Sequence, residues 1–222
     1  MTNPGAPKPK PEPKAYEYTP ARDDSPKIIR FARIGLSLML IPLSMSVFKD
    51  EYGRVPLLGD IDLAIHEFGH NLFHPFGIAF LGDTMVVAGG SLTQIAFPAL
   101  FLGYFLFNKK HRDVHAAFMS LWWVAINILD VSIYAGDARA GKLMLINGLT
   151  GQDEDSGHDF QYLFRHWGVM NKDTLYAGRM RTLAGMLVFI SIVGGLWAAW
   201  KQKPKANQSF DEEERLGGAL SS

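Results

Sequence analysis

Four long apolar stretches, separated by polar segments, dominate the pattern of the chain. They cover residues 34–48, 85–107, 114–135 and 183–200. A helix needs about 20 apolar residues to cross a bilayer, and the first stretch reaches that length if it extends back through Phe31, with Arg30 and Arg33 snorkelling to the headgroups. Four such stretches would leave little polar surface for a soluble protein. The pattern therefore predicts an all-α, polytopic membrane bundle of about four transmembrane helices in a lipid bilayer.

The two ends of the chain have a different composition. Residues 1–27 hold seven of the twelve prolines and hardly any aliphatic side chains, and residues 201–222 are also polar. Such segments bury too little apolar area to offset the entropy of ordering. We expect two disordered tails around one helical domain, residues 28–200.

Lysine and arginine mark three regions beside the apolar stretches. Seven basic residues precede the first stretch, others lie between the second and third, and more follow the fourth. Because loops rich in these residues stay in the cytoplasm, both termini are expected to be cytoplasmic. Residues 49–84 and 136–182 would then lie together on the opposite, periplasmic side.

The overall composition excludes several functions. The chain has 22 basic and 22 acidic side chains, and a balanced charge argues against nucleic acid as a partner. It has no cysteine, so thiolate nucleophiles and thiolate metal sites are excluded. Any metal site must use histidine or carboxylate ligands.

One motif fits that requirement. His66, Glu67 and His70 spell H-E-x-x-H, and on a helix the two imidazoles lie one turn apart on the same face. They can share a zinc ion while Glu67 acts as general base. Asp60 or Asp62 is expected to cap the helix, with its end near residues 75–77. This helix would lie at the outer side of the bilayer or be re-entrant.

A catalytic zinc site needs a third protein ligand. The sequence favours Asp130, a carboxylate within an apolar helix, and then His158, in the segment predicted to lie on the same side as the motif. His74 or another acidic residue are the remaining alternatives.

Three further polar residues are candidates for the surroundings of the metal. Asn127, one turn before Asp130, could hold a ligand or a substrate carbonyl, and Asp159 could orient a metal-bound imidazole as a second-shell partner. Gln94 is expected either to line the metal cleft or to form an interhelical hydrogen bond.

These residues resemble the site-2 protease-like family of membrane zinc metallopeptidases, over about residues 60–165. The resemblance rests on HEFGH at residues 66–70, on AGGSLTQIAFP after it, and on Asn127 and Asp130. A group of small bacterial membrane proteins with H-E-x-x-H looks closer still. The family's usual L-D-G reads Leu129, Asp130 and Val131 here.

The resemblance implies a function as well as a fold. It implies a bacterial inner-membrane zinc endopeptidase that hydrolyses membrane-protein or peptide substrates at or within the bilayer. Glu67 would take a proton from a water activated by zinc and return it to the leaving amine. The alternative is a non-catalytic subunit of a larger membrane complex, energy-transducing or photosynthetic, in which the motif is a structural or vestigial metal site.

Overall fold

Helices make up almost all the regular structure of the part of the chain that is described. The structure is a computed structural model, and it describes residues 25–50, 53–77, 82–153 and 157–201. The predicted tails lie outside these ranges, except for residues 25–27 and Lys201. The elements in chain order are α1 (Ser25–Lys49), α2 (Leu58–Phe76), α3 (Asp83–Phe107), α4 (Val114–Gly136), α5 (Asp159–His166), the 3-10 helix η2 (Met170–Lys172) and α6 (Asp173–Lys201). The predicted all-α bundle is confirmed.

Four helical segments are long and apolar enough to cross a membrane. They are Lys27–Lys49, Asp83–Phe107, Val114–Gly136 and Met170–Lys201. The first has 23 residues, so it does extend back through Phe31 to span length. The H-E-x-x-H helix, α2, is not one of the four. The chain is therefore a multi-pass membrane protein.

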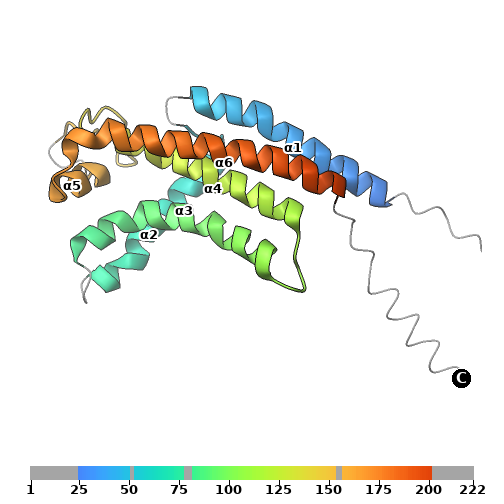
Figure 1. Cartoon of the computed structure of the whole chain (residues 1–222). Coiled ribbons are helices and arrows are strands. Elements are labelled where there is room, and N and C mark those ends of the chain that lie inside the picture. The colour runs from blue at the N-terminus through green and yellow to red at the C-terminus, as the bar shows by residue number, and fades with distance from the viewer. Residues whose placement is uncertain (1–24, 51–52, 78–81, 154–156, 202–222) are drawn as a thin grey trace, which may run out of the picture.

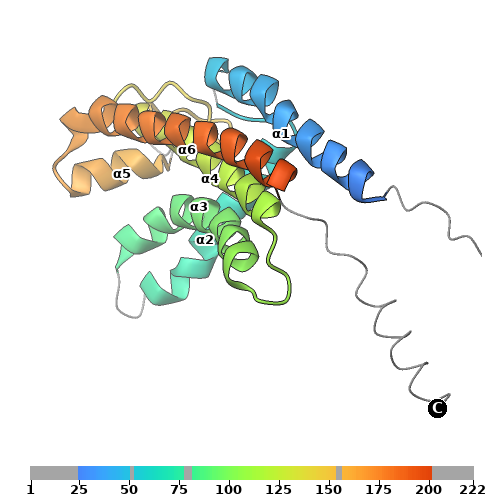
Figure 2. The same cartoon turned by 45° about the vertical axis from the view of Figure 1, so that its right-hand side comes forward.

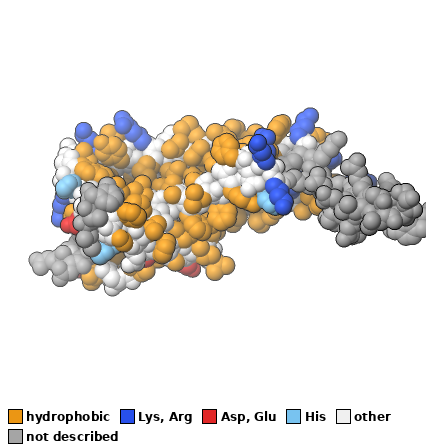
Figure 3. Space-filling view, turned by 90° about the horizontal axis from the view of Figure 1, so that it is seen from below, with side chains coloured by type: hydrophobic (Ala, Val, Ile, Leu, Met, Phe, Trp, Pro, Cys, Tyr) orange, Lys and Arg blue, Asp and Glu red, His pale blue; other side chains and the backbone are white. Residues whose placement is uncertain are grey.

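The helix α4 lies at the centre of the bundle. It makes its longest contact with α6 and also packs against α3 and α1 (Figure 1). Most of the side chains of α4 are buried, and Ala125 and Leu129 are fully buried. The outer helices instead expose large apolar side chains, such as Phe31, Leu100 and Phe189. Hydrophobic side chains cover most of the face in Figure 3, with lysine and arginine near its ends, which is the surface expected of a bundle surrounded by lipid.

The helix α2 pairs with α3 on one side of the bundle (Figures 1 and 2). The pair approaches closely because glycines meet at the crossing. A Cβ atom placed on Gly69 would collide with the carbonyl oxygen of Gly89, and one on Gly89 would lie 2.9 Å from the carbonyl oxygen of Gly69. Small residues let two helix backbones approach in this way. The short distance between α2 and α3 allows side chains of one helix to reach backbone groups of the other.

The start of α2 differs from the prediction. Leu57, with φ 67°, precedes the helix and provides no side-chain cap. Asp60 lies in the first turn, exposed, and Asp62 is buried one half-turn later. Asp62 does not cap the helix because its Oδ1 instead accepts a hydrogen bond from Trp123 Nε1 of α4, at 2.8 Å. The predicted end of the helix near residues 75–77 is confirmed, since α2 ends at Phe76.

Asp62 makes α2 sensitive to pH. Burial raises the pKa of Asp62 to about 6, although the hydrogen bond from Trp123 acts in the opposite direction. A carboxyl group whose pKa is raised on folding favours the folded state when protonated. That contribution is complete below the unfolded pKa of 3.8 and is lost as the pH rises through 6.

We predict that Asp62→Asn stabilises the protein more at pH 8 than at pH 5, because pH 5 lies between the unfolded pKa of 3.8 and the folded pKa of about 6. The amide keeps an acceptor for Trp123 and removes the buried charge, so the gain should be about 1 kcal/mol, or about 3 °C in the unfolding midpoint. Thermal unfolding in detergent at the two pH values measures it. Asp60→Asn, on the same helix but exposed, is the control and should show no such pH-dependent gain; a gain equal at both pH values would contradict the assignment.

Candidate metal centre

The two histidines of H-E-x-x-H lie together on the inner face of α2. His66 and His70 are one turn apart, with ring centroids 4.9 Å apart and the planes nearly perpendicular. His66 is buried and His70 is half-buried. Their Nε2 atoms converge on one carboxylate oxygen, Asp159 Oδ2, at 3.0 Å from His66 and 3.3 Å from His70. The motif and Asp159 therefore form one group although 89 residues separate Asp159 from His70 in the sequence.

Asp159 is the first residue of α5 and is held from several sides. Its backbone N–H donates to Tyr134 Oη of α4 at 3.0 Å. The preceding residue, His158, caps the helix, and its Nδ1 accepts from the Gln161 N–H at 3.4 Å. The buried side chains Phe160, Leu163 and Phe164 fix α5 against the bundle. The carboxylate of Asp159 is thus presented to α2 from a fixed helix start.

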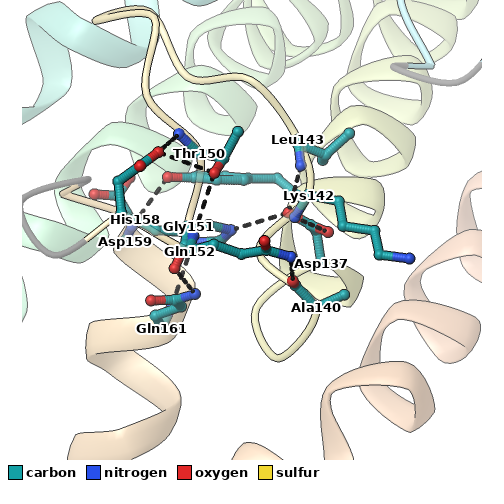
Figure 4. Close-up of polar contacts among 12 residues, drawn as sticks. Asp137, Ala140, Lys142, Leu143, Thr150, Gly151, Gln152, His158, Asp159 and Gln161 are labelled. Carbon is teal, nitrogen blue, oxygen red and sulfur yellow. Dashed lines mark hydrogen bonds and ion pairs between the residues drawn. The ribbon is translucent and has the colours of Figure 1, made fainter.

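The loop that leads to α5 is ordered around Asp137 (Figure 4). Asp137 carboxylate oxygens accept from the backbone N–H groups of Lys142 and Leu143, both at 2.9 Å. Further on, Gln161 Nε2 donates to the Gly151 carbonyl at 2.7 Å. These bonds join the end of α4 to residues 142–143 and join Gly151 to α5, so they help to hold the helix that begins with Asp159.

Hydrogen bonds on the far side of each imidazole fix its tautomer. His70 Nδ1 lies 3.0 Å from the Val86 carbonyl oxygen, which can only accept, so this nitrogen carries a proton and donates. His66 Nδ1 lies 2.9 Å from Gln94 Oε1, an acceptor as well. With Nδ1 protonated, a neutral ring keeps its lone pair on Nε2. Both lone pairs then point toward Asp159.

The orientation of the Gln94 amide follows from residues behind it. Gln94 Nε2 lies 2.7 Å from Asp130 Oδ2, and a carboxylate can only accept, so the NH₂ group faces Asp130 and the oxygen faces His66. Asp130 is held in turn by Arg54, whose Nε donates to Oδ1 at 3.1 Å. Arg54, Asp130 and Gln94 therefore form a chain of hydrogen bonds that sets the tautomer of His66.

The side chains of His66, His70 and Asp159 can serve together as ligands of a metal ion. Two imidazole lone pairs facing a carboxylate repel it unless a proton or a cation lies between them. One ligand atom from each of His66, His70 and Asp159 lies within 4.8 Å of the other two. Ligand atoms about 2.1 Å from a tetrahedral zinc ion are roughly 3.4 Å apart, close to the 3.0 and 3.3 Å observed. The carboxylate and imidazole groups can therefore hold a metal.

The wall beside the three ligands is formed by Gly90 of α3. A Cβ atom there would lie 2.6 Å from His66 Nε2 and 2.6 Å from His70 Nε2. Any larger side chain would occupy the space in front of the two ligand atoms. Gly90 therefore keeps that space open.

The charges of the group are coupled. Without a metal ion, a proton on Nε2 takes its place between the ring and the carboxylate: the hydrogen bond to Asp159 raises the pKa of His70 to about 9, because the carboxylate stabilises the imidazolium. Burial alone would raise the pKa of Asp159, but the hydrogen bonds from His66 and His70 lower it below its usual value. The carboxylate is therefore ionised, as a metal ligand must be.

A cavity of about 800 Å³ opens onto these residues. Glu67 lines it, together with the three ligand candidates, and so do Arg54 and Asp130. Apolar side chains such as Ile133 provide much of the rest of its wall. Glu67, the general base predicted from the motif, thus lies in the same cavity as the three candidate ligands.

The residues predicted from the sequence divide into two groups. Gln94, one of whose predicted roles was a lining residue, does line the cavity. Asp130 and His158, the two favoured third ligands, do not join the three-residue group. Asp130 is engaged by Gln94 and Arg54, while the fully buried His158 ring stacks on Tyr134 at 4.4 Å and faces Asp137.

The other candidates also lie away from the ligand atoms. Asn127 is buried within α4, where its Nδ2 donates to the Trp123 carbonyl at 3.0 Å, and it is not among the described residues that line the cavity. His74 is exposed near the end of α2. Asp159, predicted to orient a metal-bound imidazole without contacting the metal itself, is instead the carboxylate that lies against the nitrogens of both histidines.

Sequence reasoning missed α5, Val86, Arg54 and Tyr134. A signal for α5 was present, since Phe160, Leu163 and Phe164 have the i, i+3, i+4 spacing of an amphipathic helix and directly follow an aspartate. No sequence signal indicated that Val86 accepts a hydrogen bond from His70, because the accepting group is a backbone carbonyl. Comparison of the chain with protein-family models, with curated proteins and with solved structures gave no match.

We predict that Asp159→Ala abolishes metal binding while Asp130→Asn retains it. Loss of a direct ligand should weaken zinc affinity by more than about 100-fold, whereas loss of an outer partner costs about 10- to 100-fold. Zinc per chain after dialysis, and competition with a chromogenic chelator, measure both. Asp153→Asn, exposed in the same loop, is the control. Loss of zinc in Asp130→Asn with retention in Asp159→Ala would reverse the assignment.

We also predict that Gly90→Ala prevents metal binding without unfolding the bundle. The new methyl group occupies the space in front of His66 and His70, while alanine favours a helix more than glycine does. The matched control is Gly103→Ala on the same helix, where a Cβ meets nothing within 4 Å. Equal zinc content in the two variants would show that Gly90 does not border the metal.

Proposed function

We propose that this protein is a zinc-dependent endopeptidase of the membrane. The observation that carries the proposal is the convergence of His66 Nε2, His70 Nε2 and the Asp159 carboxylate in the cavity that Glu67 also lines. Two imidazoles and one carboxylate leave a position open on a four-coordinate ion, as catalytic zinc sites do. An acid–base residue beside an open metal site indicates hydrolysis.

Nitrogen-rich ligation favours zinc over magnesium and calcium. Two neutral imidazoles, each with its outer nitrogen bonded to an acceptor, are the ligands expected for zinc, while magnesium and calcium prefer oxygen. The bound ion would supply Lewis acidity toward a peptide carbonyl and lower the pKa of a water.

The remaining chemistry belongs to side chains of the chain itself. Glu67 takes the proton from the attacking water and returns it to the leaving amine. Glu67 is close enough to His70 to influence its charge, and it lines the cavity. The tautomer set by Gln94 and Val86 keeps both histidines available as ligands throughout.

The position of the site favours substrates that come from the membrane. The cavity is lined by residues of α3 and α4, both of span length, and by α2 and the loop before α5. We therefore propose membrane proteins or membrane-associated peptides as substrates. The two segments predicted to share one side of the membrane both contribute to the site, which supports their placement on the same side. We propose, from the distribution of lysine and arginine, that this is the outer side of a bacterial inner membrane and that the termini are cytoplasmic.

We predict that Glu67→Gln keeps zinc and loses peptide hydrolysis. The glutamine is nearly isosteric and leaves the three ligands unchanged, but it cannot accept the proton, so the rate should fall about 100-fold or more. Detergent-purified, zinc-loaded protein is incubated with fluorescein-labelled casein, and cleavage is followed by release of fluorescence. Zinc content is measured on the same samples.

The controls separate hydrolysis from a structural metal site. Asp60→Asn, exposed on the same helix, should cleave like the wild type, and a zinc chelator should stop cleavage that added zinc restores. A wild-type protein that holds zinc at one ion per chain, cleaves nothing and copurifies with other membrane proteins at fixed stoichiometry would instead support a non-catalytic subunit.

A further inference from the structure

A short extended segment of the loop between α4 and α5 borders the metal cavity. Residues 143–151 form a hairpin, here named the cavity hairpin, in which Met144 bridges to Thr150 in antiparallel fashion. Leu145 N–H donates to the Leu149 carbonyl at 2.8 Å, and Gly148 N–H closes the turn onto the Leu145 carbonyl at 2.9 Å. The hairpin is thus defined by its own backbone bonds.

One edge of the cavity hairpin is open. In an antiparallel pair, residues alternate between those whose backbone groups face the partner and those whose groups face away. Leu145 faces its partner, so the backbone N–H and C=O of Met144 face away. Within the described residues, the N–H groups of Met144 and Ile146 make no hydrogen bond. Unpaired backbone groups on a sheet edge are a template for another strand.

That open edge faces the cavity. Leu143, Met144, Leu145, Ile146 and Asn147 all line it. Successive side chains of a strand point to opposite faces, so a space that touches Leu143, Met144 and Leu145 in a row lies along the edge and not against one face. Ile146 and Asn147, in the turn, continue the same border. None of the residues 149–151 of the other arm lines the cavity. The arm with the free backbone groups is the one beside Glu67 and the metal ligands.

We infer that the cavity hairpin binds an extended, apolar stretch of polypeptide as an added strand, and so places it across the metal site. This inference rests on the proposed function and names how its substrate is held. The backbone groups of the edge require hydrogen-bonding partners, which a peptide has and a lipid acyl chain lacks. The side chains of Met144 and Ile146 are 65% and 66% exposed, so apolar contact area is available beside those bonds.

The test measures binding without cleavage. Full-length, zinc-loaded Glu67→Gln protein in detergent is titrated with a fluorescein-labelled octapeptide of alternating valine and threonine, and Kd is read by anisotropy. Two further peptides of the same sequence are compared with it. One carries N-methyl groups on the amides of the odd-numbered residues, and the other carries them on the amides of the even-numbered residues. We expect one N-methylated peptide to bind at least tenfold more weakly than the unmethylated peptide and the other to bind equally well, because only every second N–H group of an added strand faces the edge.

A pair of protein variants tests the same edge. Ile146 occupies the second position of the turn closed by Gly148, where proline is favoured, so Ile146→Pro removes the N–H without breaking the hairpin. Ile146→Ala removes the side chain and keeps the N–H. Loss of one hydrogen bond should raise Kd about five- to tenfold in the proline variant, against less than about threefold in the alanine variant.

The outcomes separate this inference from the peptidase itself. The inference would be overturned if Ile146→Pro and Ile146→Ala raised Kd equally and neither N-methylated peptide bound more weakly than the unmethylated one. It would also be overturned if the peptide did not bind to protein that holds its full content of zinc. If Ile146→Pro unfolds, judged by helical signal and zinc content, the two N-methylated peptides decide alone. If the two N-methylated peptides bind differently but the wild type cleaves no casein, the inferred binding edge would be supported and the proposed peptidase activity contradicted.

Discussion

The close approach of α2 to α3 is the constraint on which the metal centre depends. Gly69 and Gly89 let the two backbones meet, and Gly90 leaves the space in front of the histidine nitrogens. At this distance the Val86 carbonyl and the Gln94 amide reach the outer nitrogens of the two imidazoles. A separation larger by one side chain would break both bonds, and the tautomers of His66 and His70 would no longer be fixed.

The two carboxylates near the histidines, the half-buried Asp130 and the buried Asp159, have different tasks for an electrostatic reason. Asp130, inside the central helix α4, is neutralised by Arg54 and by the Gln94 amide, so its charge is already compensated. Asp159 has no arginine or lysine among its described hydrogen-bond and ion-pair partners, and its oxygen faces two imidazoles. A buried carboxylate needs positive charge or donors. Asp159 is therefore the group whose charge a cation at the histidines would balance.

The sequence could predict the parts of the molecule that depend on local pattern. Apolar length predicted the four spans, and the i, i+4 spacing predicted that His66 and His70 share a helix face. The third ligand could not be predicted in this way, because Asp159 reaches α2 only through the packing of α5 and its bond to Tyr134. An intramembrane aspartate is a good candidate for function by its cost alone, but that cost is equally met by an ion pair, and Arg54 provides one to Asp130.

The assembly of the centre from distant segments ties metal binding to the bundle. His66 and His70 come from α2, Asp159 from α5, and their supporting groups from α3 and α4. A ligand set spread over helices in this way exists only when the bundle is folded, so the free energy of metal binding also stabilises the contact between α2 and α5. The helices α2 and α5 pack little against each other, since the main neighbour of each is α3. An ion bound there would join these two helices through His66, His70 and Asp159.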